Sequence, residues 1–523
     1  MVMLASVLFA ATFTRTLERV STMDPAMATT VYDSHAVQLV YETPLEVDYA
    51  ARPYKLVPGF CELPEVSEDG LTYTFKVKAK AKIKGEQRNL STSAFGLEKE
   101  ANHHCSSSPS DFDSSDMVRS LERLRDPKIV SPNGWIVKDI DMIKAVGART
   151  VEIRLKRRCH FFPWLMAMSA CGVRGPNGEG TGPYVLSRWR KNHEMVFTRK
   201  SSHPSSLIPH PFDTVRYLVV DDASTQWLMF LKGELDFLGD ISRDNFDSVV
   251  GADGRLDPML ERQGVKLHSI PTMEVLHIGI NMRDPVLGPN KKLRQALNAA
   301  FDYPAWERFY NGRIVPCPTP VPPGVDGRIE KPFAYAFDLE KAKRLMVEAG
   351  YPDGIDPKTG RRLVLKMSIG RASQESREAG ELTAAFYEKI GIRLELDFKT
   401  WTAFVEAVSE GRVQLFRMGW VGDYPDAQNF LQLFYSKNVN PGPNHANYGN
   451  PVFDREYEAA LDATTAEERN AHWAKCQEIV QEDCPWVFTH VNKAYSLVRP
   501  TVGNYVPSDF PYGHEKHYRP VVK

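Results

Sequence analysis

Helical and strand-like patterns of apolar residues alternate along most of the chain. Residues 223–232 repeat apolar positions at helical spacing, and Gly233 follows as a helix stop before the strand-like residues 235–237. Further helices are predicted over residues 36–49, 293–302, 338–350, 379–389 and 466–482, with others beginning after Ser114 and at Trp401. Strands are predicted over residues 69–77, 150–155, 184–186, 194–197, 212–220, 275–282, 363–369, 392–398, 486–490 and 495–498. This alternation indicates an α/β architecture.

One further predicted strand leads into residues 417–426, which combine two glycines with an arginine, two aspartates and two aromatic residues. Residues 413–416 alternate as a buried strand does, and we expect the strand to continue through Gly419 and Trp420 into a turn that bears Asp423. Gly419 and Gly422 would let another backbone approach closely. A carboxylate, a guanidinium six residues earlier (Arg417) and bare backbone between them suit the capture of an extended peptide. The alternative is a strand-loop-helix connection whose charges are solvated or paired with each other.

Length and charge narrow the class of protein. At 523 residues the chain is long enough for two or three domains, with the composition of a globular protein (42% hydrophobic, 25% charged). The formal net charge of −1 implies no long-range attraction to nucleic acid or to an anionic membrane. We therefore expect no nucleic-acid partner.

The seven cysteines show no C-x-x-C and no repeated spacing, which argues against a zinc ribbon or a thioredoxin-type site. Cys159 with Cys171, and Cys476 with Cys484, are close enough in sequence to pair, and buried thiols are an equal alternative. His103, His104 and Cys105 cannot close a tetrahedral site without distant partners. The sequence predicts no metal site and no cofactor.

Motifs of catalysis are missing from the sequence. No G-x-S-x-G, H-E-x-x-H or P-loop occurs, and the glycine-dense residues 178–184 lead into strands rather than into the helix that a nucleotide loop needs. We therefore predict that the protein is not an enzyme and has no catalytic residues. The apolar residues 2–13 lack a basic start and are interpreted as a shortened export signal, within a leader of residues 1–19; the alternative is a first strand.

Several motifs in order resemble the extracellular solute-binding proteins of peptide ABC importers (family 5, the dipeptide- and oligopeptide-binding type). The likeness covers about residues 20–505. It rests on D-G-L-T-Y-T-F from Asp69, G-T-G-P-Y from Gly180, G-I-N-M from Gly279, D-L-E-K-A-K from Asp338 and R-M-G-W-V-G-D from Arg417. The chain departs from the family pattern at Asp426-Ala427, where a proline usually follows the acid, and at residues 82–86 of the inserted domain.

This resemblance implies the α/β, two-lobed periplasmic-binding-protein fold (type II, cluster C) with an extra β-rich inserted domain and a two-crossing hinge. Lobe I would comprise residues 20–52, 165–268 and 489–523, the inserted domain residues 53–164, and lobe II residues 269–488. We place the crossings near residues 269–271 and 483–489.

The same resemblance implies a site. Asp423 would bind the α-ammonium group of a peptide, and the main chain of Gly419, Trp420 and Val421 would pair with the ligand backbone. Arg417 corresponds to a position that holds a charged or C-terminal group, with pairing to Asp426 or Glu406 as the alternative. Trp401 would line a side-chain pocket. Trp401, Trp420 and Tyr424 would offer aromatic contact area, and the alternative for all three is packing in the core.

The implied function is the substrate-binding component of an ABC importer, a monomer that captures short peptides in a closing cleft outside the cytoplasm and delivers them to the permease subunits. One alternative keeps the fold and binds haem, a nickel chelate, an oligosaccharide or an opine, because function depends on the site. Another is a receptor or chaperone-like protein that feeds no transporter.

Overall fold

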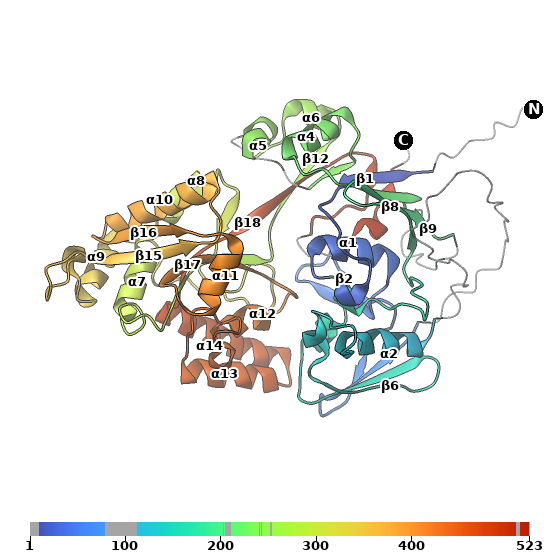
Figure 1. Cartoon of the computed structure of the whole chain (residues 1–523), viewed down its shortest axis with the longest axis horizontal. Coiled ribbons are helices and arrows are strands. Elements are labelled where there is room, and N and C mark those ends of the chain that lie inside the picture. The colour runs from blue at the N-terminus through green and yellow to red at the C-terminus, as the bar shows by residue number, and fades with distance from the viewer. Residues whose placement is uncertain are drawn as a thin grey trace, which may run out of the picture. The chain divides into compact units, whose positions relative to one another are not determined.

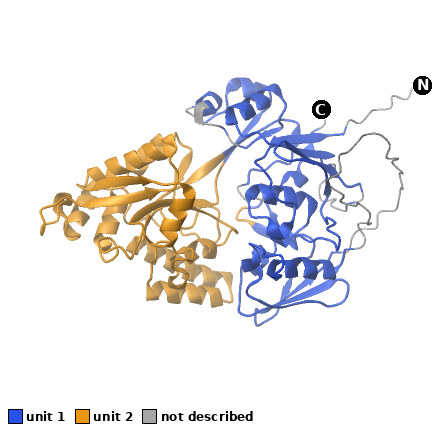
Figure 2. Ribbon diagram, in the orientation of Figure 1, with its two compact units in different colours: residues 1–51, 55–269, 495–523 blue, residues 52–54, 270–494 orange. Residues whose placement is uncertain are grey.

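The computed structural model describes residues 10–78, 112–201, 203, 211–239, 241, 243–251, 254–508 and 513–521. The chain divides into two compact units (Figure 2): unit 1 comprises residues 1–51, 55–269 and 495–523, and unit 2 comprises residues 52–54 and 270–494. Apart from the short segment 52–54, the chain crosses from unit 1 to unit 2 between residues 269 and 270 and returns between residues 494 and 495. The first falls within the predicted crossing, and the second lies beyond the predicted residues 483–489. The short segment 52–54 groups with unit 2, which the sequence did not indicate.

Unit 1 contains a mixed sheet in the order β18-β11-β1-β10-β9-β8. Its strand β1 runs parallel to β10, with Phe13 opposite Val215 and fully buried. The leader predicted over residues 1–19 therefore overlaps a core strand. The bounds are β1 (Thr12–Thr16), β8 (Tyr184–Arg190), β9 (Glu194–Arg199), β10 (Thr214–Leu218), β11 (Phe237–Leu238) and β18 (Trp486–Val498).

A second, antiparallel sheet of unit 1 has the order β4-β5-β7-β6 and packs against helix α2. The predicted Asp69-Gly70 turn joins β4 to β5, and Gly70 has the positive φ of 68° that favours glycine there. The sheet lies within residues 53–164, the predicted β-rich insertion. The bounds are β4 (Glu65–Val66), β5 (Thr72–Lys76), β6 (Ile140–Ala145), β7 (Thr150–Leu155) and α2 (Ser114–Glu122).

The helix predicted over residues 36–49 is wrong in position. Helix α1 spans Val31–Val40, and its first turn is closed by a capping box between Thr30 and Asp33. The chain then becomes extended, because Pro44 disfavours a helical residue before it, and strand β2 (Leu45–Asp48) pairs with β3 (Lys55–Pro58).

The remaining elements of unit 1 include one predicted without error. Helix α4 covers Ala223–Lys232 and ends on Gly233, whose φ is 82°. The others are α3 (Phe162–Leu165), α5 (Arg243–Val249), α6 (Pro258–Arg262), β12 (Lys266–Pro271), β19 (Val502–Gly503) and β20 (Arg519–Pro520).

Unit 2 is built on a sheet in the order β16-β15-β17-β13-β18, with β14 also paired to β18 (Figure 1). Strands β16, β15 and β17 run parallel to one another, and β13 is antiparallel to both of its neighbours. The two strands predicted over 486–490 and 495–498 are one continuous strand, β18. The bounds are β13 (Glu274–Ile280), β14 (Ile314–Pro316), β15 (Val364–Ile369), β16 (Arg393–Phe398) and β17 (Leu415–Val421).

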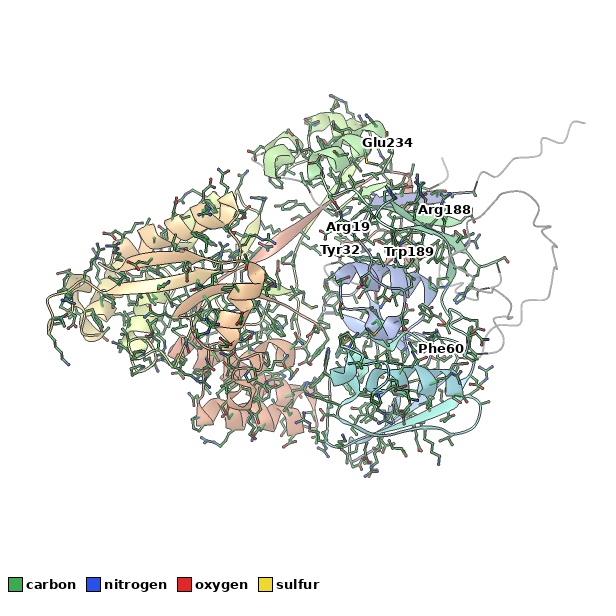
Figure 3. All side chains as sticks on the ribbon, in the orientation of Figure 1. Arg19, Tyr32, Phe60, Arg188, Trp189 and Glu234 are labelled. Atoms are coloured by element: carbon green, nitrogen blue, oxygen red, sulfur yellow. The ribbon has the colours of Figure 1, made fainter. Side chains whose placement is uncertain are left out.

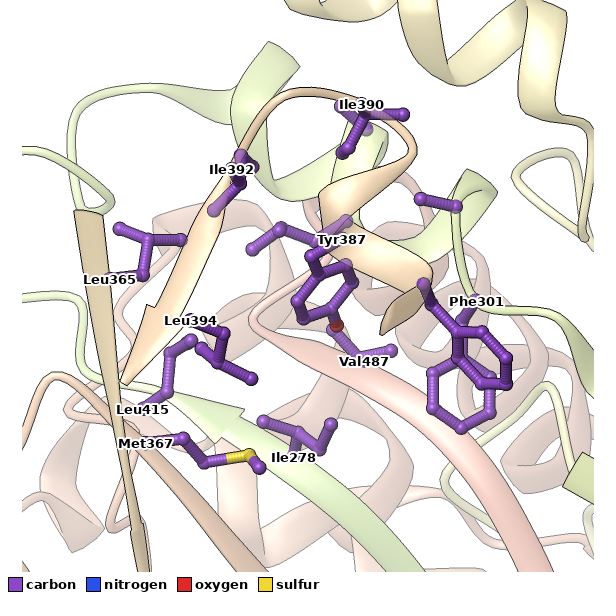
Figure 4. Packing of buried hydrophobic residues seen from close by; sticks show 14 of the residues in the cluster. Ile278, Phe301, Leu365, Met367, Tyr387, Ile390, Ile392, Leu394, Leu415 and Val487 are labelled. Atoms are coloured by element: carbon purple, nitrogen blue, oxygen red, sulfur yellow. The ribbon is translucent and has the colours of Figure 1, made fainter. Parts of the chain in front are cut away.

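The helices predicted in unit 2 occur in the predicted order, and further helices over residues 303–309, 427–431 and 451–462 were not predicted; together they cover the sheet. Their bounds are α7 (Lys291–Ala299), α8 (Tyr303–Phe309), α9 (Leu339–Glu348), α10 (Gln374–Glu388), α11 (Trp401–Ser409), α12 (Ala427–Leu431), α13 (Pro451–Asp462) and α14 (Ala466–Asp483). A core between these helices and the sheet contains Leu365, Leu394 and Leu415 from three strands and Tyr387 from α10. Figure 4 shows the Tyr387 ring among aliphatic side chains of this core. Such packing fixes the position of β17.

Six cysteines lie in the described part of the chain, and all are buried thiols outside any disulfide bond (61, 159, 171, 317, 476 and 484). Buried thiols are therefore the correct alternative for these six. The seventh, Cys105, lies outside the described residues, as do His103 and His104. None of the described helices is both long and apolar enough to cross a bilayer.

Candidate ligand-binding site

Strand β17 extends beyond the end of one neighbouring strand, β15, but is paired along its whole length with the other, β13. On one side β13 pairs with every residue from Leu415 to Val421. On the other side β15 pairs only with Leu415, Phe416 and Arg417. The four residues from Met418 to Val421 thus have no strand partner on the β15 side within the described chain. An unpaired strand edge presents backbone donors and acceptors that another extended chain can use.

Asp423 lies two residues beyond the end of β17. Burial raises the pKa of its carboxyl, and a hydrogen bond from Asn429 acts in the opposite direction. The Nδ2 group of Asn429 donates to Asp423 Oδ2 at 3.1 Å. The carboxylate is therefore held in a fixed orientation in a site that disfavours its charge, and an incoming cation would offset that cost.

Trp420 joins the same cluster. Its indole Nε1 donates to Asn429 Oδ1 at 2.9 Å, and the ring is half-buried. Val421 is 58% exposed and Gly419 is exposed, so the backbone of this strand end is accessible within unit 2. The structure thus brings the predicted residues Gly419, Trp420, Val421 and Asp423 together.

The two glycines of the motif also have a packing role that the sequence did not indicate. A Cβ atom at Gly419 would lie 2.6 Å from Leu276 Cδ1, and one at Gly422 would lie 2.8 Å from Phe430 Cζ. Both glycines therefore make room for side chains of unit 2.

Arg417 is directed away from this cluster. Its Nη2 donates to the hydroxyl oxygen of Tyr310 at 2.5 Å, and its guanidinium lies 5.5 Å from the centre of the Trp306 ring. Trp306 Nε1 in turn donates to His490 Nδ1 at 3.0 Å. Burial, helped by the nearby Arg417 charge, lowers the pKa of His490 to about 3, so this histidine is neutral at pH 7.

The alternative partners of Arg417 are engaged elsewhere. Glu406 pairs with Arg412, and Asp426 caps helix α12 by accepting from the backbone of Gln428 at 2.8 Å. Within the described chain Arg417 pairs with neither acid. Its guanidinium lies instead beside the rings of Tyr310 and Trp306. Side chains three residues apart in a strand point to opposite faces of the sheet, so Arg417 and Trp420 lie on opposite faces.

Trp401 stands at the end of β15. It is the first residue of α11 and is 62% exposed. A Cβ at Gly370, directly after β15, would lie 3.0 Å from Trp401 Cε3. The indole is therefore beside the place where β15 stops and the open edge of β17 begins.

Arg371 follows Gly370 and was missed by the sequence reasoning. Its side chain is exposed, and the described residues include no hydrogen-bond or ion-pair partner for it. A glycine and a cation directly after a predicted strand were the available signal. The sequence alone does not relate Arg371 to the site, because the pairing of β15 with β17 is not visible in it.

Tyr424 is buried, with 3% of its surface exposed. Its hydroxyl donates to Gln428 Oε1, and Gln428 Nε2 donates to the Tyr457 hydroxyl at 2.6 Å. These contacts place Tyr424 in the interior beneath the turn, where it offers no aromatic surface.

A cavity of about 10 Å³ lies behind Trp420. It is lined by Met418, His445 and His277, and the His277 ring stacks on Trp486 with centres 3.5 Å apart. Burial lowers the pKa of His277 to about 3. The described residues contain no group of three or more His, Cys, Asp or Glu side chains arranged to hold a metal ion.

A larger concavity, of about 280 Å³, lies in unit 1 between residues 17–21 and the β8-β9 hairpin. Arg19 and Trp189, both labelled in Figure 3, are among its lining residues. Arg19 pairs with Asp221, and Arg190 pairs with the buried Glu194. The charges of these two arginines are thus matched within unit 1.

Comparisons with known proteins agree with this architecture. Residues 55–442 match the family model described as bacterial extracellular solute-binding proteins, family 5 Middle. Haem-binding protein A of Haemophilus influenzae is 26% identical over 507 residues, which cover 90% of this chain and 85% of that protein. The dipeptide-binding protein of Escherichia coli K12 is 23% identical over 509 residues, which cover 91% of this chain and 88% of that protein. The structure of HbpA2 from Haemophilus parasuis matches with a TM-score of 0.82 at 21% identity, and covers 98% of this chain and 100% of that one. The predicted two-lobed α/β fold class is confirmed.

Proposed function

Because the chain belongs to family 5 of the bacterial extracellular solute-binding proteins, we propose that it captures short peptides for an ABC importer. This is a family of solute-binding proteins rather than of catalysts. The observation that carries the peptide proposal is the open edge of β17 at Met418–Val421, two residues before the Asp423 carboxylate.

A peptide bound there would occupy the position in the sheet that β15 leaves after Ile369. Its backbone would pair with β17 regardless of side chains, so many sequences would bind. Its α-ammonium group would pair with Asp423, and a charge-assisted hydrogen bond of this kind contributes about 1.5–3 kcal/mol. The exposed Trp401 would offer a sequence-tolerant surface to one side chain.

Two cations are candidates for the ligand carboxylate. Arg371 is exposed, has no ion-pair partner within the described chain, and follows β15 at the start of the open edge. Arg417 is half-buried and donates to Tyr310 rather than to an acid. Amidated peptides should bind more weakly than free acids to the native protein. Loss of that difference in Arg371→Ala or in Arg417→Ala identifies which cation is used.

Calorimetric titration with tri- to pentapeptides and with their N-acetylated counterparts tests the proposal. We expect the free peptides to bind and acetylation to abolish binding, with the same loss in Asp423→Ala. Equal binding of both sets would keep peptides as ligands and remove the anchor role of Asp423. Binding of neither set would refute the peptide proposal.

Haem is a second candidate ligand, supported by the similarity to haem-binding protein A. Only that similarity supports it, because the cavity of about 10 Å³ behind Trp420 has room for a water molecule and not for a porphyrin. A Soret absorbance titration of the protein with haem would separate this candidate from peptides. Whichever ligand is bound, the proposal includes a monomer outside the cytoplasm that delivers it to permease subunits.

A further inference from the structure

One amide side chain connects the proposed anchor to the neighbouring aromatic wall. Asn429 is the third residue of α12 and is completely buried. Its Oδ1 accepts from Trp420 Nε1 at 2.9 Å and from the backbone N–H of Asp423 at 3.1 Å. Its Nδ2 donates to Asp423 Oδ2 at 3.1 Å.

The chemistry of these partners fixes the orientation of the amide. An indole N–H and a backbone N–H can only donate, so both require the oxygen of Asn429, and an ionised carboxylate can only accept, so it requires the nitrogen. A flipped amide would lose all three hydrogen bonds. The orientation is therefore determined by the partners rather than by an arbitrary choice between two similar atoms.

We propose that Asn429 is a positioning residue that aims the Asp423 carboxylate, keeps it ionised and couples it to Trp420, so that the site selects ligands bearing an ammonium group. The predicted effect of Asn429 on peptide binding rests on the proposed function, whereas its predicted effect on the Asp423 carboxyl does not.

The electrostatic part of the proposal follows from two opposing effects on one group. Burial raises the pKa of Asp423, and the Asn429 donor lowers it. A protonated Asp423 cannot pair with an ammonium group. Removing the donor would therefore raise the pH below which ligand binding fails.

Two variants separate this role from packing. Asn429→Asp keeps the size and the acceptor oxygen for Trp420 but replaces the donor with a second carboxylate. Asn429→Leu keeps approximate size and removes both donor and acceptor without adding charge. Gln432→Glu is the matched control, because the only hydrogen bond of Gln432 Nε2 among the described residues is to the backbone oxygen of Asn429, at 3.0 Å, and the change adds the same charge one turn away.

The first readout uses ligand-free protein. The ¹³C carboxyl resonance of Asp423, assigned by its loss in Asp423→Asn, is followed against pH. We expect its midpoint to rise by about one pH unit or more in both Asn429 variants, and to stay within about 0.3 pH units in the control. The Trp420 indole N–H resonance should move in Asn429→Leu and stay close to its native position in Asn429→Asp. Unchanged carboxyl midpoints in both variants would overturn the inference.

The second readout is peptide affinity between pH 4 and pH 7. We expect the affinity loss of Asn429→Asp to be largest at the acid end of this range and smallest at pH 7. Raising the Asp423 midpoint by about one pH unit lowers the ionised fraction about tenfold at any pH below both midpoints, and changes it little at a pH above both. An equal loss at every pH would indicate packing alone and would refute the positioning role. A raised carboxyl midpoint in a protein that binds no free peptide would support the role of Asn429 and refute the proposed function.

Discussion

Backbone methylation of a peptide ligand tests the open strand edge directly. The backbone groups of successive residues in a strand face opposite sides, so about two of the four residues from Met418 to Val421 direct an N–H and a C=O toward the open side. A paired ligand would therefore form at most about four backbone hydrogen bonds with this edge.

The cost of losing one such bond can be stated. N-methylation of a ligand amide removes a donor and leaves a carbonyl of β17 without its partner. An unsatisfied group of this kind costs about 1–3 kcal/mol, which corresponds to about a 5- to 150-fold increase in Kd. Because the pairing alternates, methylation of every second amide should carry this cost, and methylation of the amides between should not.

The assay is a calorimetric titration of the native protein with pentaalanine and with each of its four singly N-methylated forms. A two-residue period in Kd along the ligand would support strand addition. Equal effects at all four amides, or no effect above about twofold at any of them, would refute pairing with β17.

Three further predictions concern single residues. Burial raises the pKa of Asp423 in the native state, so the contribution of this carboxyl to folding stability falls as the pH rises from its unfolded pKa of about 3.9 through its higher native pKa. Asp423→Asn should therefore raise Tm at pH 7 and leave Tm unchanged near pH 3. Trp401 is 62% exposed, so Trp401→Ala should change the free energy of unfolding by less than about 0.5 kcal/mol in a urea titration while weakening peptide binding. Burial opposes ionisation of Glu515, but His35 and Arg15 hold the pKa of its carboxyl below its usual range, with Arg15 Nη1 at 2.6 Å. That stabilisation is present above the unfolded pKa of about 4.3 and is lost as pH falls toward the native pKa, so Glu515→Ala should lower the unfolding free energy by about 3–5 kcal/mol at pH 7 and by much less at pH 2.

Elements with strong local signals were predictable from the sequence. Helix α4 was placed without error because its apolar spacing ends on Gly233, and α11 begins at Trp401 as predicted. Helix α1 was misplaced because the pairing of Thr30 with Asp33 was overlooked and strand β2, which contains the apolar residues Leu45 and Val47, was attached to it. Strand β18 was predicted as two strands, with Asn492 and Lys493 between them, yet pairing to β14 carries the strand through Asn492.

The site shows the same division between local and tertiary information. The order of Arg417, Trp420 and Asp423 along the chain is visible in the sequence. Their grouping is not, because Asn429 returns from α12 to hold two of them while Tyr310 of another segment holds the third. The open edge itself depends on where β15 stops relative to β17, which is a property of sheet register.

A crystal structure of the protein with a free tripeptide would test the central claim most directly. We expect the peptide backbone to run beside Met418–Val421 within hydrogen-bonding distance, with its ammonium nitrogen about 2.7–2.9 Å from an oxygen of Asp423. A peptide that lies elsewhere, or that leaves this strand edge and Asp423 without contact, would contradict the account.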